Sequence, residues 1–129
     1  MTFLKAVHHI AIICSDYKIS KHFYTAILGC EIISETYRDS RNSYKLDLSL
    51  HGQYIIELFS FPNPAKRPSG PEATGLRHLA FEVDDIKEAV AYFEHHGIIV
   101  EPTRVDLLTH KKFTFFRDPD DLPIELYEL

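Results

Sequence analysis

Two histidine–glutamate pairs occur at nearly the same spacing in the two halves of this 129-residue chain. His9 precedes Glu57 by 48 residues, and His78 precedes Glu125 by 47 residues. Imidazole nitrogens and carboxylate oxygens together suit borderline divalent cations, whereas Ca²⁺ prefers ligands that are all oxygen. The four side chains are therefore a candidate site for one divalent ion: Zn²⁺, Ni²⁺, Co²⁺, Mn²⁺ or Fe²⁺.

The sequence around each pair repeats as well. "HIAIICSD", which starts at His9, matches "HLAFEVDD", which starts at His78, and both Glu57 and Glu125 are centred in Ile-Glu-Leu. A lone histidine or glutamate in a strand is usually a surface or structural side chain. Four unrelated residues would not share one spacing, so the pattern indicates an internal duplication whose equivalent positions converge.

Strand alternation predicts which side chains face the site. His9 shares a strand face with Ala11, and His78 shares one with Ala80, whereas His8 is expected on the opposite face. The glutamate of each pair stands between apolar neighbours, where an inward carboxylate is unfavourable unless it is paired or bound to a cation. This favours a metal-binding interpretation of both pairs.

The first half is predicted to fold as βαβββ. Ser15 or Asp16 can cap a helix that ends near Gly29. The buried stripe of this helix is predicted to contain Ile19, Phe23 and Ile27. The strands that follow are predicted near 31–38, at 44–50 and around Glu57, with a tight turn at 51–52.

The second half is predicted to repeat this order. Asp84 or Asp85 can cap a helix that ends at Gly97. The buried stripe of this helix is predicted to contain Ile86, Ala89, Val90 and Phe93. Strands are predicted in "IIVEPTRV", in "KKFTFFR" and, after the turn "DPDD", around Glu125.

The chain is long enough for one domain with a two-layer core. The stretch "FPNPAKRPSGPEATG" carries four prolines and two glycines and is predicted to be a surface linker. We therefore expect a single domain with module 1 at about residues 4–61, the linker at about 62–75 and module 2 at about 76–129.

Composition excludes several classes of partner. The net charge is −5 and no basic cluster is interleaved with aromatic residues, which disfavours nucleic acid. The longest apolar runs are about six residues, far short of the roughly 20 that span a membrane. Cys14 and Cys30 fit no disulfide framework, so we expect reduced thiols and a cytoplasmic protein without a signal peptide.

Five segments spread over the chain carry a family resemblance: "HHIAIICSD", "FYTAILG", "IIELFSF", "RHLAFEVDD" and "DPDDLPIEL". They resemble the vicinal oxygen chelate superfamily, which includes glyoxalase I, extradiol dioxygenases, methylmalonyl-CoA epimerase and the fosfomycin and bleomycin resistance proteins. The resemblance implies an α+β fold in which the two βαβββ modules form a partly closed mixed β-barrel around a metal site. The implied metal ligands are His9, Glu57, His78 and Glu125.

A set of four ligands resembles glyoxalase I, whereas the dioxygenases and fosfomycin enzymes usually offer two histidines and one glutamate. The resemblance implies a metal-dependent lyase or isomerase that stabilises the enediolate of a small α-oxygenated carbonyl substrate. It assigns proton transfer to Glu125, with Glu57 on the opposite face of the substrate. No nicotinamide or flavin motif is expected for such chemistry.

The glutathione contacts of similar glyoxalase I enzymes are altered. Ile13 stands where those enzymes carry arginine, Phe61 stands where they carry asparagine, and Asp121 replaces the glycine of the "DPDG" turn. These changes put glutathione dependence in doubt. Cations that could supply an anion site elsewhere are Arg38, Arg41, Lys45, Lys111 and Lys112.

Three other functions stay open from the sequence. They are an Fe(II) dioxygenase, a thiol transferase that modifies an antibiotic, and a non-catalytic binder that sequesters a drug. The intact ligand set disfavours the binder, because drug-sequestering members of the superfamily typically lack these ligands. In either pairing of the modules, apolar strand edges remain to be covered, so we also expect a homodimer.

Overall fold

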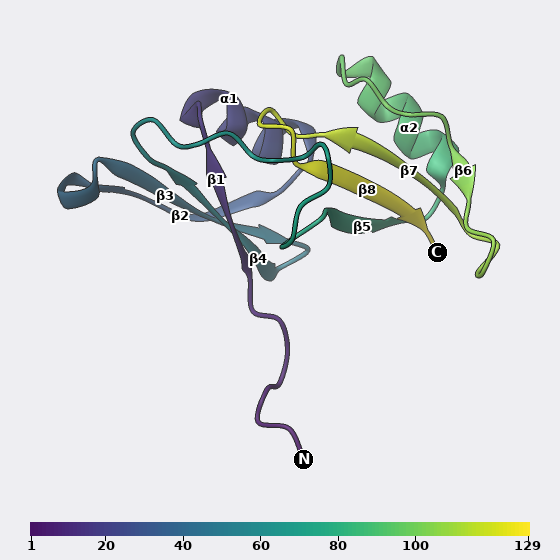
Figure 1. Cartoon of the computed structure of the whole chain (residues 1–129), viewed down its shortest axis with the longest axis horizontal. Coiled ribbons are helices and arrows are strands. Elements are labelled where there is room, and N and C mark those ends of the chain that lie inside the picture. Colours follow the sequence, from purple (N-terminus) through teal and green to yellow (C-terminus); the bar gives the residue numbers. More distant parts are fainter. The chain divides into compact units, whose positions relative to one another are not determined.

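The computed structural model describes residues 1–129 as two compact units, residues 1–65 and residues 66–129 (Figure 1). Each unit contains a four-stranded mixed sheet and a helix. The strand order is β1-β4-β3-β2 in the first unit and β5-β8-β7-β6 in the second. The two orders are equivalent, so the predicted α+β class and the repeated βαβββ topology are confirmed.

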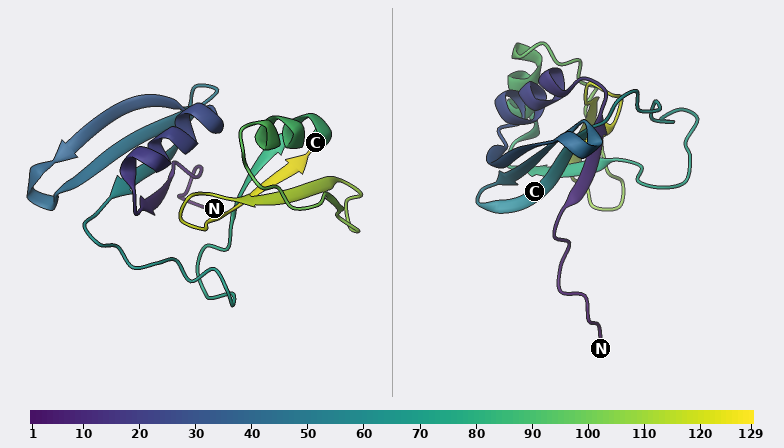
Figure 2. Two further views of the ribbon diagram at one scale, coloured as in Figure 1. Left: turned by 90° about the horizontal axis from the view of Figure 1, so that it is seen from above. Right: turned by 90° about the vertical axis from the view of Figure 1, so that its left-hand side faces the viewer.

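The first unit contains β1 (Ile10–Cys14), α1 (Tyr17–His22), β2 (Glu31–Arg38), β3 (Ser43–Leu50) and β4 (Gln53–Ser60). A π-helical turn at Phe23–Ile27 extends α1, and a 3₁₀ turn at Asp39–Arg41 joins β2 to β3. β1 runs parallel to β4, and the other neighbouring strands are antiparallel. Figure 2 shows α1 lying along one face of this sheet.

The second unit contains β5 (Leu79–Val83), α2 (Ile86–His95), β6 (Arg104–Val105), β7 (Lys112–Arg117) and β8 (Pro123–Glu128). β5 is parallel to β8, as β1 is to β4. The predicted strand in "IIVEPTRV" is reduced to the two residues of β6. Pro102 has no N–H to donate to a ladder, which confines regular pairing to the residues after it.

The buried stripe of the first helix differs from the predicted one. Asp16 caps α1 as predicted, because its side chain accepts a hydrogen bond from the Ile19 amide at 3.1 Å. Ile19 itself is 55% exposed, so its predicted burial is wrong. The fully buried Tyr24 ring defines the inward face, and Ser20 and Phe23 share that face at helical spacing.

Turn residues adopt the conformations that the predicted connections need. His51 (φ 50°) and Gly52 (φ 77°) are both left-handed, as a two-residue hairpin between β3 and β4 requires.

Asp85 caps α2, because its side chain accepts a hydrogen bond from the Glu88 amide at 3.0 Å. Residues 61–78, between β4 and β5, contain no helix or strand and are largely exposed.

Each sheet has one face turned to its helix and one face left for other contacts. In the first unit Leu46, Leu48, Ile56 and Leu58 are fully buried, and residues that alternate with them lie on the opposite face. In the second unit the Phe116 ring packs against Phe93 of α2 at a centroid distance of 4.7 Å. The opposite faces carry the predicted glutamates.

The hydrogen-bonded ladders form two separate four-stranded sheets and no closed barrel, so enclosure of a metal by both modules remains a prediction.

Cys14 and Cys30 are buried free thiols, and burial raises the pKa of Cys30 to about 11. No helix has the length and apolar character needed to cross a membrane.

Candidate metal centre

The first histidine–glutamate pair is assembled by the parallel pairing of β1 with β4. In this register Ala11 lies beside Glu57, and His9 precedes Ala11 by two residues. The His9 Nε2 atom lies 3.1 Å from Glu57 Oε1. The structure therefore brings together the first two residues that the sequence predicted, on the face of the sheet opposite α1.

The second pair is assembled in the same way by β5 and β8. Ala80 lies beside Glu125, and His78 Nε2 lies 3.9 Å from Glu125 Oε1. Neither unit by itself gathers a third histidine, cysteine, aspartate or glutamate into a group that could hold a metal. Each unit thus supplies two candidate ligands, and the sharing of one ion by all four remains a prediction.

The donor atoms fit a divalent ion in chemistry and spacing. Neighbouring ligands at about 2.1 Å from a metal lie about 3.0 Å apart in octahedral geometry and about 3.4 Å apart in tetrahedral geometry. The 3.1 Å separation of His9 Nε2 and Glu57 Oε1 falls within this range. The 3.9 Å separation in the second pair would have to shorten by a fraction of an ångström.

His8 contributes to the first pair although it was expected on the opposite face. Its Nδ1 atom lies 2.7 Å from His9 Nδ1, and its ring centroid lies 5.0 Å from that of Tyr54. The expectation is wrong because His8 and His9 precede β1, where strand alternation does not apply. When a metal is bound, donation from His9 Nδ1 to His8 would leave the Nε2 lone pair of His9 for the ion.

His78 has a different partner. Its Nδ1 atom lies 3.0 Å from the guanidinium of Arg77, which also pairs with Glu72 at 2.6 Å. Arginine has no acceptor, so His78 Nδ1 accepts this bond and Nε2 carries the proton that faces Glu125. Metal ligation through Nε2 therefore requires the Arg77 contact to open and the proton to move to Nδ1.

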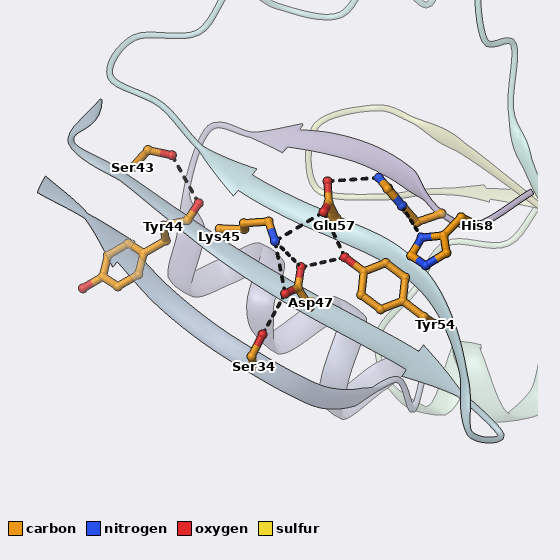
Figure 3. A network of polar contacts seen from close by, with 9 residues as sticks. His8, Ser34, Ser43, Tyr44, Lys45, Asp47, Tyr54 and Glu57 are labelled. Carbon is orange, nitrogen blue, oxygen red and sulfur yellow. Dashed lines mark hydrogen bonds and ion pairs between the residues drawn. The ribbon is translucent and has the colours of Figure 1, made fainter. Parts of the chain in front are cut away.

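A polar network holds the Glu57 carboxylate (Figure 3). Oε2 of Glu57 accepts a hydrogen bond from the Tyr54 hydroxyl at 3.0 Å and lies 3.3 Å from Lys45 Nζ. Tyr54 and Lys45 also contact Asp47, at 2.7 Å and 3.1 Å. The network occupies Oε2 and leaves Oε1 directed at His9.

The protonation states suit this arrangement. Partial burial, followed by the hydrogen bonds to Asp47 and Glu57, raises the pKa of Tyr54, which therefore remains a donor. The hydrogen bond to Asp47 is the main cause of the raised pKa of Lys45. Burial by itself would raise the pKa of Asp47. The hydrogen bonds from Ser34, Tyr54 and Lys45 outweigh burial, so the pKa is lowered. In this network the ammonium group of Lys45 lies between the carboxylates of Asp47 and Glu57.

The second unit has no such network around Glu125. The residue beside Glu125 on β7 is Phe115, in the place that Asp47 takes beside Glu57. Phe113 occupies the position equivalent to Lys45, and Leu122 occupies the position of Tyr54. Glu125 consequently accepts no hydrogen bond, and its one ion-pair contact is His78.

Glu125 instead lines an open cavity of about 390 Å³ at the surface of the second unit. Apart from Glu125, the cavity is lined by Val105, Asp106, Leu107, Leu108, Phe113 and Tyr127. The Tyr127 hydroxyl donates to Asp106 at 3.0 Å, which ties the β6–β7 loop to β8. A mostly apolar cavity of this size beside a weakly solvated carboxylate suits a small substrate.

Sequence reasoning identified Lys45 only as a cation and missed Asp47 and Tyr54 as neighbours of the site. One signal was available, because Asp47 interrupts the leucines of β3 and Tyr54 precedes Glu57 by three residues. Their meeting depends on the β3–β4 register, in which Asp47 lies opposite Glu57.

Replacing Tyr54 by phenylalanine should weaken metal binding about tenfold, because partners of a metal ligand commonly contribute 10- to 100-fold in affinity. The change removes the 3.0 Å bond to Glu57 and keeps the ring. Competition with a fluorescent zinc chelator measures the affinity. Tyr44→Phe is the matched control, because the Tyr44 hydroxyl makes no hydrogen bond and its ring stacks on Tyr17. Equal affinities of both variants would contradict the role of Tyr54.

The fold agrees with the family comparison. The family model described as Glyoxalase/Bleomycin resistance protein/Dioxygenase superfamily matches residues 6–126. The chain belongs to this superfamily, as the resemblance of its segments predicted.

Relatives align over nearly the whole chain. It is 64% identical over 125 residues to the protein YaeR of Escherichia coli (strain K12), which is 97% of either chain. It is 62% identical over 125 residues to the protein YwkD of Bacillus subtilis (strain 168), with 97% of this chain and 98% of YwkD covered. A 2-epi-5-epi-valiolone epimerase of Actinomyces is 25% identical over 145 residues, which cover 96% of this chain and 79% of the epimerase.

Solved structures show the same fold. A glyoxalase family protein from Enterococcus faecalis is 50% identical with a TM-score of 0.91, covering 98% of this chain and 100% of that protein. The fosfomycin resistance protein FosX from Listeria monocytogenes, in complex with Mn(II) and 1S,2S-dihydroxypropylphosphonic acid, has a TM-score of 0.74 at 19% identity. That comparison covers 97% of this chain and 93% of FosX. At this identity the similarity to FosX concerns the fold alone.

Proposed function

We propose that this protein is a metal-dependent lyase or isomerase of the glyoxalase I type that acts on a small α-oxygenated carbonyl compound. The observation that carries the proposal is the duplicated pair, His9 with Glu57 and His78 with Glu125, on strands paired in the same register. Superfamily membership and the Mn(II) complex of FosX support a metal at this fold.

In this proposal all four side chains hold one divalent ion. When bound, the ion would act as a Lewis acid for the negative charge that develops on two adjacent substrate oxygens. Tyr54 and Lys45 keep Oε2 of Glu57 occupied, so that Oε1 is the atom available as ligand. His8 holds the ring of His9 in orientation.

Glu125 is the better candidate for the base that moves the proton on carbon. It accepts no hydrogen bond and lines the cavity of the second unit, whereas Glu57 is held by two donors. A general base must be free to approach the carbon acid. The superfamily relative named as an epimerase supports chemistry of this class.

The alternatives are distinguished by metal content and by reaction. A drug-sequestering protein would bind its ligand without a metal, so protein purified without added metal would carry none. A dioxygenase would require Fe²⁺ and consume O₂, and a thiol transferase would consume a thiol. The lyase or isomerase proposal requires instead a metal-dependent exchange of the α-proton of a hydroxycarbonyl compound with solvent deuterium, followed by proton NMR.

We predict that the metal-loaded protein turns over the hemithioacetal of methylglyoxal and glutathione poorly. Ile13 is 53% exposed on the face of β1 that carries Ala11, and Phe61 lies just after β4, so neither position offers a polar contact to the tripeptide. Burying a carboxylate against an apolar side chain is unfavourable. Thioester formation is followed by its ultraviolet absorbance. A kcat/KM of about 10⁵ M⁻¹s⁻¹ or more, an ordinary enzymatic value, would contradict this prediction.

We further propose a homodimer. β2 is the edge strand of its sheet and pairs only with β3, so its outer side is unpaired, and Ile32 and Ile33 on it are 47% and 52% exposed. Exposed apolar edges favour association with a second copy. Light scattering at micromolar concentration should give twice 14.9 kDa. A mass of one chain under these conditions would contradict the proposal.

A further inference from the structure

Two guanidinium groups share one aromatic ring at the end of the first sheet. Cζ of Arg38 lies 4.9 Å from the centre of the Phe59 ring and 5.7 Å from that of Phe61. Cζ of Arg41 lies 5.5 Å from the same Phe61 ring. The two phenyl rings are stacked, with centroids 5.9 Å apart. The two phenyl rings thus form an apolar surface that the guanidinium groups of Arg38 and Arg41 cover.

Neither guanidinium has an acidic partner. No aspartate or glutamate oxygen lies within 4.0 Å of Arg38 or Arg41, whereas Arg77, Arg104 and Arg117 each pair with a carboxylate. Arg38 donates to the Ser43 hydroxyl at 3.0 Å, and its buried Nε has no partner. Two cations brought together over a ring repel each other unless an anion lies between them.

The position of this pair relates it to the candidate metal ligands. Glu57, Phe59 and Phe61 alternate along β4 and its continuation, so they share a face of the sheet. At about 3.3 Å per residue, the two rings lie roughly 7 and 13 Å along the strand from Glu57. The two guanidinium groups therefore lie on the order of 10 Å from the carboxylate that we propose as ligand.

We infer that Arg38 and Arg41 bind an oxyanion, a carboxylate or a phosphate, of the substrate. Guanidinium groups recognise both anions through paired N–H donors. The part of the inference that concerns the substrate rests on the proposed function. It makes the substrate an α-oxygenated carbonyl compound that carries one terminal anionic group about 10 Å from its metal-binding oxygens. The chain between the two ends would cross the Phe59 ring.

The anion site is tested first without reference to the metal. The full chain, labelled with ¹⁵N, is titrated with inorganic phosphate and, separately, with acetate, and the side-chain Nε–H signals of arginine are followed by NMR. We expect saturable shifts at Arg38 and Arg41 with at least one of the anions, and the tighter anion identifies the class. Arg41→Gln, at an exposed position, should weaken the binding about tenfold, and Arg38→Gln should do the same.

Arg117→Gln is the matched control, because Arg117 is an exposed arginine already paired with Asp121 at 3.2 Å. Its replacement should leave anion binding unchanged. Linear shifts that do not saturate with either anion would overturn the inference. Equal binding by the wild type and the two variants at Arg38 and Arg41 would overturn it as well.

A second experiment asks whether the anion and the metal-binding oxygens belong to one ligand. The metal-loaded protein is titrated with the monohydroxamates of succinic, adipic and suberic acid, and with octanohydroxamate as the uncharged compound of the longest length. Suberic monohydroxamate should bind about tenfold more tightly than octanohydroxamate, and Arg41→Gln should remove this preference. Equal binding of the two compounds by the wild type would overturn the proposed substrate class.

The two experiments separate the possible failures. If no hydroxamate binds, octanohydroxamate included, the proposed metal chemistry has failed, and the substrate class fails with it. Phosphate and acetate still decide the anion site in that case, because their titration needs no metal. Saturable anion binding at Arg38 and Arg41 would then stand by itself.

Discussion

Glu125→Gln should reduce the metal-dependent exchange of the substrate's α-proton by at least about 100-fold, which is the usual contribution of a general base. An amide oxygen can still coordinate a metal, but it cannot accept the proton. We therefore expect the variant to retain a metal ion with a modest loss of affinity. The effect should be large because Glu125 lines the cavity of the second unit and accepts no hydrogen bond, whereas Glu57 accepts one from Tyr54 and pairs with Lys45.

The measurement is solvent-deuterium exchange by proton NMR, over a panel of small α-hydroxy aldehydes and ketones, with metal content determined on the same samples. Glu94→Gln, an exposed position on α2, is the control for removal of one carboxylate from the second unit. Exchange by Glu125→Gln at the wild-type rate would rule Glu125 out as the base. Loss of the metal together with the activity would show that Glu125 acts mainly as a ligand.

His9→Ala and His78→Ala should each lower metal affinity by at least about 100-fold, more than the loss expected for a residue that only supports a ligand. One divalent ion per chain should bind to the wild type. The reason is that each unit offers only two ligands, and two ligands with solvent are a weak site. If the four residues hold one ion as proposed, removal of a histidine from either unit should disable the same centre.

Calorimetric titration with Zn²⁺ and Mn²⁺ gives the stoichiometry and the affinities. His22→Ala is a suitable control, because His22 is exposed at the end of α1. Two ions per chain, or an unchanged second ion after His9→Ala, would mean that the His9–Glu57 and His78–Glu125 pairs are separate sites. That result would remove the basis of the proposed chemistry.

The sequence by itself determined the duplication, the βαβββ order and the composition of both pairs. These features follow from local rules: an apolar strand alternates in period two, and a helix begins at Asp16 or Asp85 and ends before a glycine. The partners of each pair could be predicted because equivalent positions in a repeat occupy equivalent strands. The structure places His9 beside Glu57 and His78 near Glu125 accordingly.

The tertiary structure alone decided what surrounds each pair. Asp47 lies opposite Glu57 while Phe115 lies opposite Glu125, and this difference holds one carboxylate in a network and leaves the other free. The sequence lists both residues but not the strand register that sets them across from the glutamates. The repeat predicted both glutamates as ligands, and their cross-strand neighbours give them different surroundings.

The same reason accounts for the features that sequence reasoning missed. His8 contacts Tyr54 because the segment before β1 leaves the strand pattern, and Arg38 and Arg41 meet over Phe61 because a short turn returns β2 toward the end of β4. Contacts of this kind join residues that are distant in sequence or outside regular elements. They depend on how the chain closes its sheet, and no local periodicity contains that information.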